Sequence, residues 1–403
     1  MGTVRIPSAA LTQQQRTRPV AADLFRVIAI GMVGWFHIWQ QSWQNVGSFT
    51  YLAHSGAAWV DGLIMLSAFC LFLPYATNWA ENKPFPEIDV PAFFKKRAIR
   101  ILPSYNVLIF TALIVTILTD GTGPWLWKDL AAHLTFTQSW FVGSSIGTHL
   151  GSTTWTLTLF ALFYLIFPVV AKAMYNAPLR TGIAFFAVQL LWRWTITPYY
   201  GTTEYSMRFN QLPAFASTLA LGMWGAMTFA ALARSDRLAS WWVRGLCTTG
   251  GCGTLYLVTR LLNDLHRSPD YQLWQLQNRT PLVIGMTLAL VLLSLGLPLP
   301  GAKVWAFLSA ISYNFYLWHQ TLIVWMKYKL HLPAWQGELP PNQLGDTAWI
   351  AKSNLLYWAA ALTAAILMTW LVEKPCVKIY KNYQNKRRTR ADANEKVPAH
   401  PAE

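Results

Sequence analysis

Long apolar stretches recur along this chain and are separated by shorter polar segments. Each stretch is about 20 residues long, which is the length that an α-helix needs to cross the hydrocarbon core of a membrane. We place ten such segments, at residues 24–43, 56–76, 101–119, 153–174, 181–199, 212–233, 244–262, 281–299, 305–328 and 353–373. The pattern therefore predicts an all-α, polytopic membrane protein built as a bundle of about ten transmembrane helices.

The apolar segments divide the chain into a membrane part and two polar ends. We predict an N-terminal segment at 1–22, a membrane domain at 23–375 and a basic tail at 376–403. Composition agrees with this division, because 54% of the residues are hydrophobic and only 12% are charged, whereas a soluble domain carries about 25% charged residues. No separate soluble domain remains once the ten segments are removed.

The net charge of +15 is distributed unevenly between the two sides of the predicted bundle. Basic residues gather in alternate connections: Arg16 and Arg18; Lys95, Lys96, Arg97 and Arg100; Arg234 and Arg237; and Lys374, Lys378, Lys381, Lys386, Arg387, Arg388 and Arg390. The positive-inside rule places these connections and both termini in the cytoplasm, with the helices in the plasma membrane. This segregation indicates membrane topology and excludes nucleic acid as a partner.

Two predicted outer connections run against that scheme. They carry Arg260, Arg267 and Arg279 in 260–280, and Lys327, Lys329 and Lys352 in 327–352. Charge counting alone leaves these six residues without an explanation.

The first apolar segment carries two ionisable residues on one helical face. Arg26 and His37 are eleven residues apart, so they return to nearly the same side of a helix, about 16 Å apart along its axis. Ionisable groups inside a membrane are costly and usually face a cavity that serves a function. The alternative is an interfacial arginine and a histidine that is hydrogen-bonded within the bundle.

Further polar residues suggest where a site lies. Arg97 and Arg100 share a helical face before the third segment; paired guanidinium groups suit a polyphosphate, and the alternative is a basic cluster that sets topology. Asp61 is expected near the outer end of its helix, where it reaches water, as either a first-turn acid or a functional group. Ser67 follows on another face of that helix.

The last two segments contribute a second polar group. Tyr313, Tyr316 and His319 are spaced by threes and share a face, either paving a polar cavity or hydrogen-bonding between helices. Glu373 lies at the cytoplasmic boundary as a partner for the basic loops. The four cysteines, at 70, 247, 252 and 376, have no metal-ligand spacing, so we predict no metal site.

Taken together, these segments resemble the acyltransferase 3 family of integral membrane acyltransferases. The motifs that carry the resemblance appear in the family's order: Asp23, Arg26 and His37 in the first helix, VDGLIMLSAF from Val60, RAIRILPSY from Arg97, WTLTLFALFYL from Trp155, ISYNFYLWH from Ile311, and Glu373-Lys374-Pro375. Two residues depart from the family pattern. Phe160 stands where many members carry glutamate, and Ala68 replaces glycine.

The resemblance implies transfer of an acyl group, usually acetyl, from acyl-coenzyme A to a hydroxyl of a saccharide on the cell surface or on a lipid carrier. His37 would act as general base or as acyl carrier, Arg26 would orient the donor, and Arg97 with Arg100 would hold coenzyme A. Acyl-CoA is then a co-substrate, and no permanently bound cofactor is expected. Membrane lipids and the saccharide acceptor are the expected partners.

Two other functions fit the same helices. A transporter or flippase for a lipid-linked saccharide would also bury polar groups, although we find no inverted repeat. A catalytically silent relative is the third possibility, because Phe160 replaces the glutamate.

Overall fold

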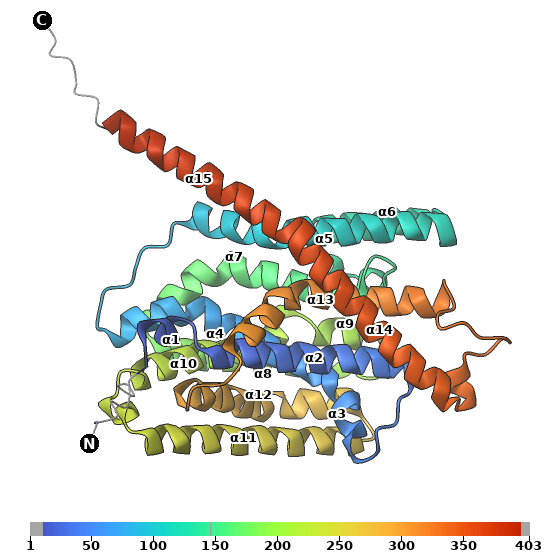
Figure 1. Cartoon of the computed structure of the whole chain (residues 1–403), viewed down its shortest axis with the longest axis horizontal. Coiled ribbons are helices and arrows are strands. Elements are labelled where there is room, and N and C mark those ends of the chain that lie inside the picture. The colour runs from blue at the N-terminus through green and yellow to red at the C-terminus, as the bar shows by residue number, and fades with distance from the viewer. Residues whose placement is uncertain (1–10, 146, 396–403) are drawn as a thin grey trace, which may run out of the picture.

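The structure is a computed structural model that describes residues 11–145 and 147–395. Within these residues it contains helices and no strand. Ten helices of 17 residues or more form the bundle (Figure 1): α2 (Val20–Ser42), α4 (Trp59–Ala80), α5 (Val90–Asp120), α7 (Trp155–Asn176), α8 (Pro178–Ile196), α10 (Ala216–Leu232), α11 (Trp241–Arg267), α12 (Tyr271–Leu295), α13 (Ala302–Tyr328) and α14 (Thr347–Met368).

Within the described residues, four shorter α-helices precede or connect them, and one further helix of 22 residues follows them. These are α1 (Gln13–Thr17), α3 (Thr50–His54), α6 (Pro124–Leu134), α9 (Thr203–Phe209) and α15 (Lys374–Glu395), which extends the chain away from the bundle in Figure 1. The first ten and last eight residues, which belong to the predicted polar ends, lie outside the described residues.

Seven of the ten predicted segments are helices both long and apolar enough to cross a membrane, counted over the described residues. The remaining three, α8, α11 and α13, are helical but more polar. In α13 the polar residues, among them Ser309, Asn314 and His319, are buried inside the bundle, which lowers the apolar character without exposing charge to lipid. The protein is thus an all-α polytopic membrane protein, and the count of about ten crossings stays a prediction.

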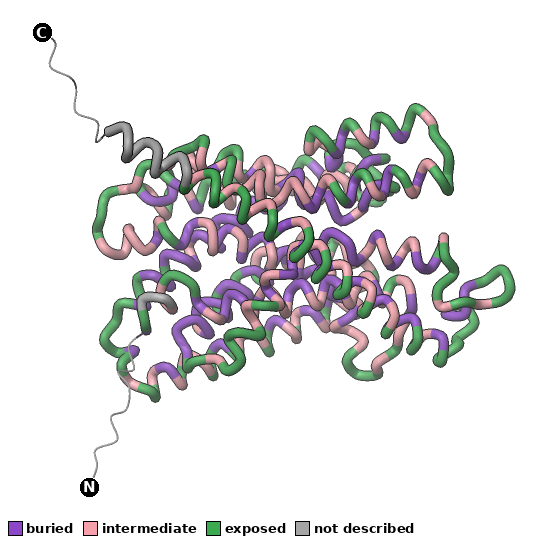
Figure 2. The backbone as a smooth tube through the Cα atoms, turned by 45° about the horizontal axis from the view of Figure 1, so that its top comes forward, coloured by how far each residue is buried: buried purple, intermediate pink, exposed green. Residues whose placement is uncertain are grey.

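The outer helices present apolar side chains where a soluble protein would be polar. Leu118, Leu165, Val169, Trp194 and Leu355 are all exposed, and Figure 2 shows the exposed backbone along the periphery with buried residues inside. Exposed apolar surface on this scale is typical of a lipid-facing protein.

Helices inside the bundle approach each other closely through small residues. A side chain at Gly222 of α10 would overlap the Met65 carbonyl of α4, and one at Gly56 would overlap the Met32 carbonyl of α2. Because lipid is as apolar as leucine, such close van der Waals contact is what holds membrane helices together.

Because α2, α5 and α13 run in one direction and α4 in the other, the bundle has two distinct ends (Figure 1). We call the end where α2 begins and α4 finishes the entrance end. The end where α2 finishes and α4 begins is the far end.

The expectation that Asp61 reaches water is wrong. Asp61 is fully buried, and its Oδ1 lies 2.9 Å from Nε of Arg279 on α12. The side-chain amide of Gln275 donates a hydrogen bond to Oδ2 of Asp61 at 3.0 Å. The placement of Arg279 in an outer connection is also wrong, because α12 begins at Tyr271 and the arginine is buried in its third turn. A buried charge of this kind persists because it is paired and hydrogen-bonded.

The described part of the long connection, residues 120–145 and 147–152, forms a cap on the far end. His133 of α6 contacts Oδ1 of Asp129 at 3.1 Å and the Thr154 hydroxyl at 3.1 Å, and the Tyr105 hydroxyl donates to the His133 carbonyl. Burial favours a raised pKa for Asp129, but hydrogen bonds from His133 and Thr148 outweigh it and keep the pKa below its usual value. The cap therefore fixes the start of α7 through Thr154.

Candidate active site

Two histidines from different helices meet inside the bundle, in the halves of α2 and α13 that are nearer the far end. His37 of α2 and His319 of α13 are 282 residues apart in sequence, yet Nδ1 of His37 lies 2.7 Å from Nε2 of His319. His319 is fully buried and His37 is half-buried. The pair is the shortest polar contact between α2 and α13 side chains and brings together two of the predicted site residues.

Backbone carbonyls determine which nitrogen of each neutral ring carries the proton. Nδ1 of His319 lies 3.0 Å from the carbonyl oxygen of Phe315 and 2.9 Å from that of Tyr316. A carbonyl can only accept, so Nδ1 of His319 is the donor and its Nε2 is an acceptor. His37 must then donate from Nδ1, which leaves Nε2 of His37 with a free lone pair. That nitrogen is the position of a general base.

A cavity of about 680 Å³ leads from the entrance end towards this pair. Lys96, Arg97 and Arg100 line its mouth, together with Glu87 and Asp89. Farther in, the walls become mainly apolar, and the deepest residues come from the first turns of α4 and α7 and from α13. The cavity therefore combines a charged mouth with a largely apolar interior.

Tyr316 connects the cavity to the histidines. Its side chain lines the cavity, its carbonyl accepts from His319, and the two rings have centroids 5.9 Å apart. Tyr313 also lines the cavity, and its hydroxyl donates to the Ile101 carbonyl at 2.9 Å. Both predicted roles of this row, paving a cavity and bonding between helices, thus occur together.

The arginines at the mouth are held in different ways. The guanidinium of Arg97 lies 3.3 Å from the Phe93 ring centroid and donates to the Phe93 carbonyl. Arg100 lies 3.7 Å from Oε1 of Glu373, whose Oε2 accepts from Asn314 at 2.9 Å. Glu373 ends a π-helical turn, Thr369–Glu373, and such turns often re-aim side chains at functional sites.

Arg26 lies inside the cavity wall rather than at its mouth. Its guanidinium donates to the Ser309 hydroxyl at 3.1 Å and contacts the Cys70 sulfur at 3.7 Å. Ser67 lines the same cavity and donates to the Leu63 carbonyl. Arg26 therefore lines the cavity, whereas His37, eleven residues farther along α2, does not.

Three predicted supporting residues lie away from the cavity. Asp23 is buried and pairs with Arg18 at 3.2 Å at the start of α2. Trp155 stacks on Phe215, with centroids 6.1 Å apart. Asp61 belongs to the buried pair with Arg279. Each joins or steadies helices, and none lines the cavity.

Phe160, the residue that replaces the family's glutamate, lines the cavity and stacks on Tyr164 with centroids 6.2 Å apart. The wall is consequently aromatic where a carboxylate would lie in many members. His319 is held by backbone carbonyls of α13 and not by the residue at position 160. His319 in turn orients His37.

Sequence reasoning missed several residues of the site, including Ser309, Asn314 and Tyr164. Ser309 and Asn314 lie in the α13 segment that holds the tyrosine row, so polar residues in a buried helix were the available signal. Among the described residues, no group of three or more His, Cys, Asp or Glu side chains could hold a metal ion.

Comparison with known proteins gives the family. A family model described as an acyltransferase domain, that of acyltransferase 3, matches residues 20–374. Nodulation protein 10 of Rhizobium leguminosarum bv. viciae is 23% identical over 201 residues, which cover 45% of this chain and 52% of that protein. Acyltransferase MdmB of Streptomyces mycarofaciens is 29% identical over 150 residues, 36% of this chain and 37% of that protein.

The matched regions span about half or less of these curated relatives. No solved structure matches. The family match covers the whole helical bundle, including both histidines and the basic mouth. The chain therefore belongs to the acyltransferase 3 family of membrane acyltransferases.

Proposed function

We propose that this protein transfers an acyl group, with acetyl as the first candidate, from acyl-CoA to a hydroxyl group of a cell-surface or lipid-linked saccharide. The observation that carries the proposal is the cavity, which runs from a basic mouth to Tyr316, whose carbonyl accepts from His319 of the His37–His319 pair. The proposal includes a plasma-membrane location with both termini in the cytoplasm.

The cavity suits the two-part structure of acyl-CoA. Its nucleotide carries several phosphate charges, and Lys96, Arg97 and Arg100 offer cationic donors at the mouth. Its pantetheine arm is thin and mostly neutral, which fits the apolar interior. Arg26, within the wall, would donate a hydrogen bond to a carbonyl of that arm.

The reaction follows from the free nitrogen of His37. Nε2 of His37 accepts the proton of the acceptor hydroxyl while the oxygen attacks the thioester carbonyl. The carbon–sulfur bond of the resulting tetrahedral intermediate then breaks, and the coenzyme A thiolate takes the proton from His37. An ester and free coenzyme A are the products, so atoms and charge balance. His319 acts as a positioning residue that keeps the proton on Nδ1 of His37.

Purified protein tests the reaction class. With acetyl-CoA and an extract of envelope saccharides and lipid carriers, wild-type protein should release coenzyme A and acetylate the extract. His37→Ala should slow this by about 10²–10⁴, the usual contribution of a general base. Coenzyme A release is followed with a thiol reagent, and acylation by mass spectrometry.

The matched control is His149→Ala, because His149 is half-exposed and pairs with Asp120 away from the cavity. It should keep the wild-type rate. Saccharide movement without any coenzyme A release would instead indicate a transporter. Binding of acetyl-CoA without turnover in any extract would indicate a silent relative.

A further inference from the structure

The basic residues that oppose the charge pattern divide into two groups in the structure. Three have internal partners: Arg279 pairs with Asp61 at 2.9 Å, Lys327 donates to the Gln41 carbonyl at 2.6 Å, and Lys329 pairs with Asp120 at 2.8 Å. Arg260, Arg267 and Lys352 have no hydrogen-bond or ion-pair partner among the described residues, and the two arginines lie on one helix, α11. Their charge is available to something outside the chain.

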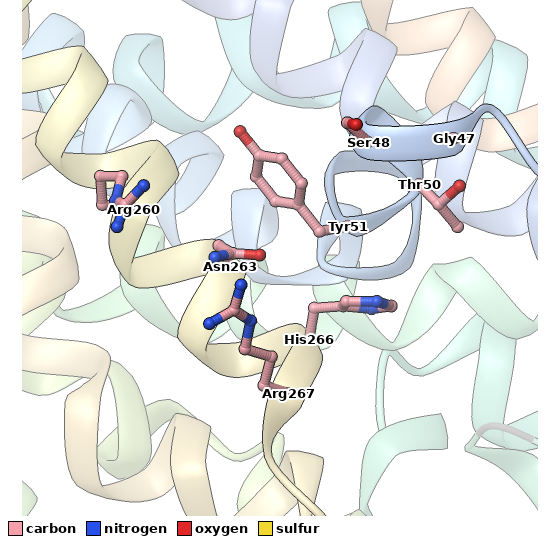
Figure 3. Close-up of a pocket in the computed structure, with 8 residues that line it drawn as sticks. All are labelled: Gly47, Ser48, Thr50, Tyr51, Arg260, Asn263, His266 and Arg267. Carbon is pink, nitrogen blue, oxygen red and sulfur yellow. The ribbon is translucent and has the colours of Figure 1, made fainter.

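Arg260 and Arg267 line a pocket of about 490 Å³ at the far end of the bundle. They lie on α11 with Asn263 between them, at positions that share one helical face about 10 Å long. Figure 3 shows these three side chains on the side of α11 that faces Tyr51 and Ser48. The pocket is separate from the cavity, which opens at the entrance end.

The chemistry of the lining favours a phosphate group. Two guanidinium forks, the Asn263 amide and the hydroxyls of Ser48 and Tyr51 are all hydrogen-bond donors, and no carboxylate lines the pocket. Asp264 is within one turn of both arginines but is exposed and outside the lining. The planar guanidinium group of arginine binds phosphate through two parallel hydrogen bonds.

Exposed aromatic side chains place the pocket at the membrane surface. Phe49 is 63% exposed beside Ser48, and Tyr256 is 61% exposed one turn before Arg260. Aromatic residues of this kind concentrate at the headgroup level of a bilayer. The phosphate groups found at the headgroup level of a bilayer are those attached to lipids.

A row of rings connects the pocket to the histidine pair. His266 lines the pocket, and its ring centroid lies 4.7 Å from that of His54. The centroids of His54 and Trp39 are 5.0 Å apart. The Phe36 ring lies between Trp39 and His37, with centroid distances of 6.4 and 5.2 Å. Burial, and then the neighbouring His266, lowers the pKa of His54. Arg260 and Arg267 supply the fixed positive charge of the pocket.

We propose that Arg260 and Arg267 bind a lipid-borne phosphate at the far end, and that this is the phosphate of the lipid-linked saccharide whose hydroxyl reaches His37. The second part rests on the proposed acyl transfer. The phosphate of a membrane phospholipid has the same chemistry, so the experiment separates the two sources.

Binding is measured first, without acyl-CoA, on purified protein in nanodiscs of neutral phosphatidylcholine. The probes are a fluorescent short-chain polyprenyl phosphate, the corresponding polyprenol, inorganic phosphate and phosphatidylglycerol. The test variant is Arg260→Gln with Arg267→Gln. The control is Arg193→Gln with Lys352→Gln, which removes two basic charges outside the pocket.

Wild-type and control proteins should bind the polyprenyl phosphate, and the test variant should bind it roughly tenfold more weakly for each arginine lost, as charge-assisted hydrogen bonds imply. Equal binding by test and control variants, or equal binding of the polyprenol, would overturn the site. Arg260→Lys with Arg267→Lys should recover binding in part, which guards against loss by misfolding.

The acceptor assignment is tested next by acyl transfer. The test variant should raise the KM for the lipid-linked acceptor and leave the KM for acetyl-CoA unchanged. If phosphatidylglycerol competes as well as polyprenyl phosphate and the acceptor KM does not move, the acceptor assignment is overturned. If no acyl transfer occurs at all, the proposed function fails, while the binding results still decide the phosphate site.

Discussion

At the scale of single residues, the account depends on which nitrogen of His37 is free. Two carbonyl oxygens of α13, from Phe315 and Tyr316, hold the proton of His319 on Nδ1. The resulting acceptor, Nε2 of His319, accepts a hydrogen bond from the Nδ1–H of His37, with the two nitrogens 2.7 Å apart. The two α13 carbonyls thereby determine the tautomer of His37 through the ring of His319.

Replacing His319 tests this orientation directly. His319→Ala should lower kcat by about 10²–10³, because the His37 ring loses the acceptor that fixes its tautomer, whereas His319→Gln should recover part of the rate because its amide oxygen can accept the same proton. The KM for acetyl-CoA should stay near the wild-type value. Equal rates for the alanine and glutamine variants would show that His319 only fills space.

At the scale of helices, a buried ion pair joins α4 to α12. Asp61 and Arg279 are 0% and 2% exposed in their side chains, and the Arg279 guanidinium also lies 4.0 Å from the Phe215 ring centroid and donates to the Ala214 carbonyl. The pair thus connects two helices to the turn that precedes α10. Breaking one partner would leave an uncompensated charge inside the bundle.

We therefore expect Asp61→Asn to destabilise the protein by about 3–5 kcal/mol. The thermal unfolding midpoint in detergent should fall markedly, while Asp264→Asn, an exposed carboxylate on α11, should leave it unchanged. A double variant, Asp61→Leu with Arg279→Met, should recover much of the loss because no charge remains buried. An unchanged midpoint for Asp61→Asn would mean that the pair contributes nothing to the packing of α4 on α12.

The helices themselves could largely be predicted from the sequence, and their polar partners could not. Each of the ten apolar segments is helical over most of its length, since twenty apolar residues in lipid have little alternative. The starts of α5 at Val90 and α12 at Tyr271 precede the predicted segments by about ten residues, because their first turns are polar or amphipathic. The length of an apolar segment does not show where a helix with a polar first turn begins.

The predicted site shows the same limit. Spacing on one helix placed Tyr313, Tyr316 and His319 on a common face, as the structure has them. The contact between His37 and His319 joins residues 282 apart, and the partner of Asp61 is on a helix far along the chain. Periodicity says nothing about which helices are neighbours, so the exposure of Asp61 was predicted wrongly.

At the scale of the whole molecule, the two ends of the bundle differ in chemistry. The entrance end carries the basic mouth of the cavity, and the far end carries the separate pocket lined by Arg260 and Arg267. The histidine pair lies between them. This arrangement fits a reaction in which the donor and the acceptor reach one base from opposite sides of the membrane.

The most direct test supplies labelled acetyl-CoA to sealed membrane vesicles of known orientation. Everted vesicles, which expose the cytoplasmic face, should label envelope saccharide, and right-side-out vesicles should not. In everted vesicles His37→Ala should abolish labelling, and Arg97→Ala with Arg100→Ala should raise the KM for acetyl-CoA, with Arg→Lys replacements restoring it only in part. Equal labelling of right-side-out vesicles, or wild-type labelling by His37→Ala, would contradict the account.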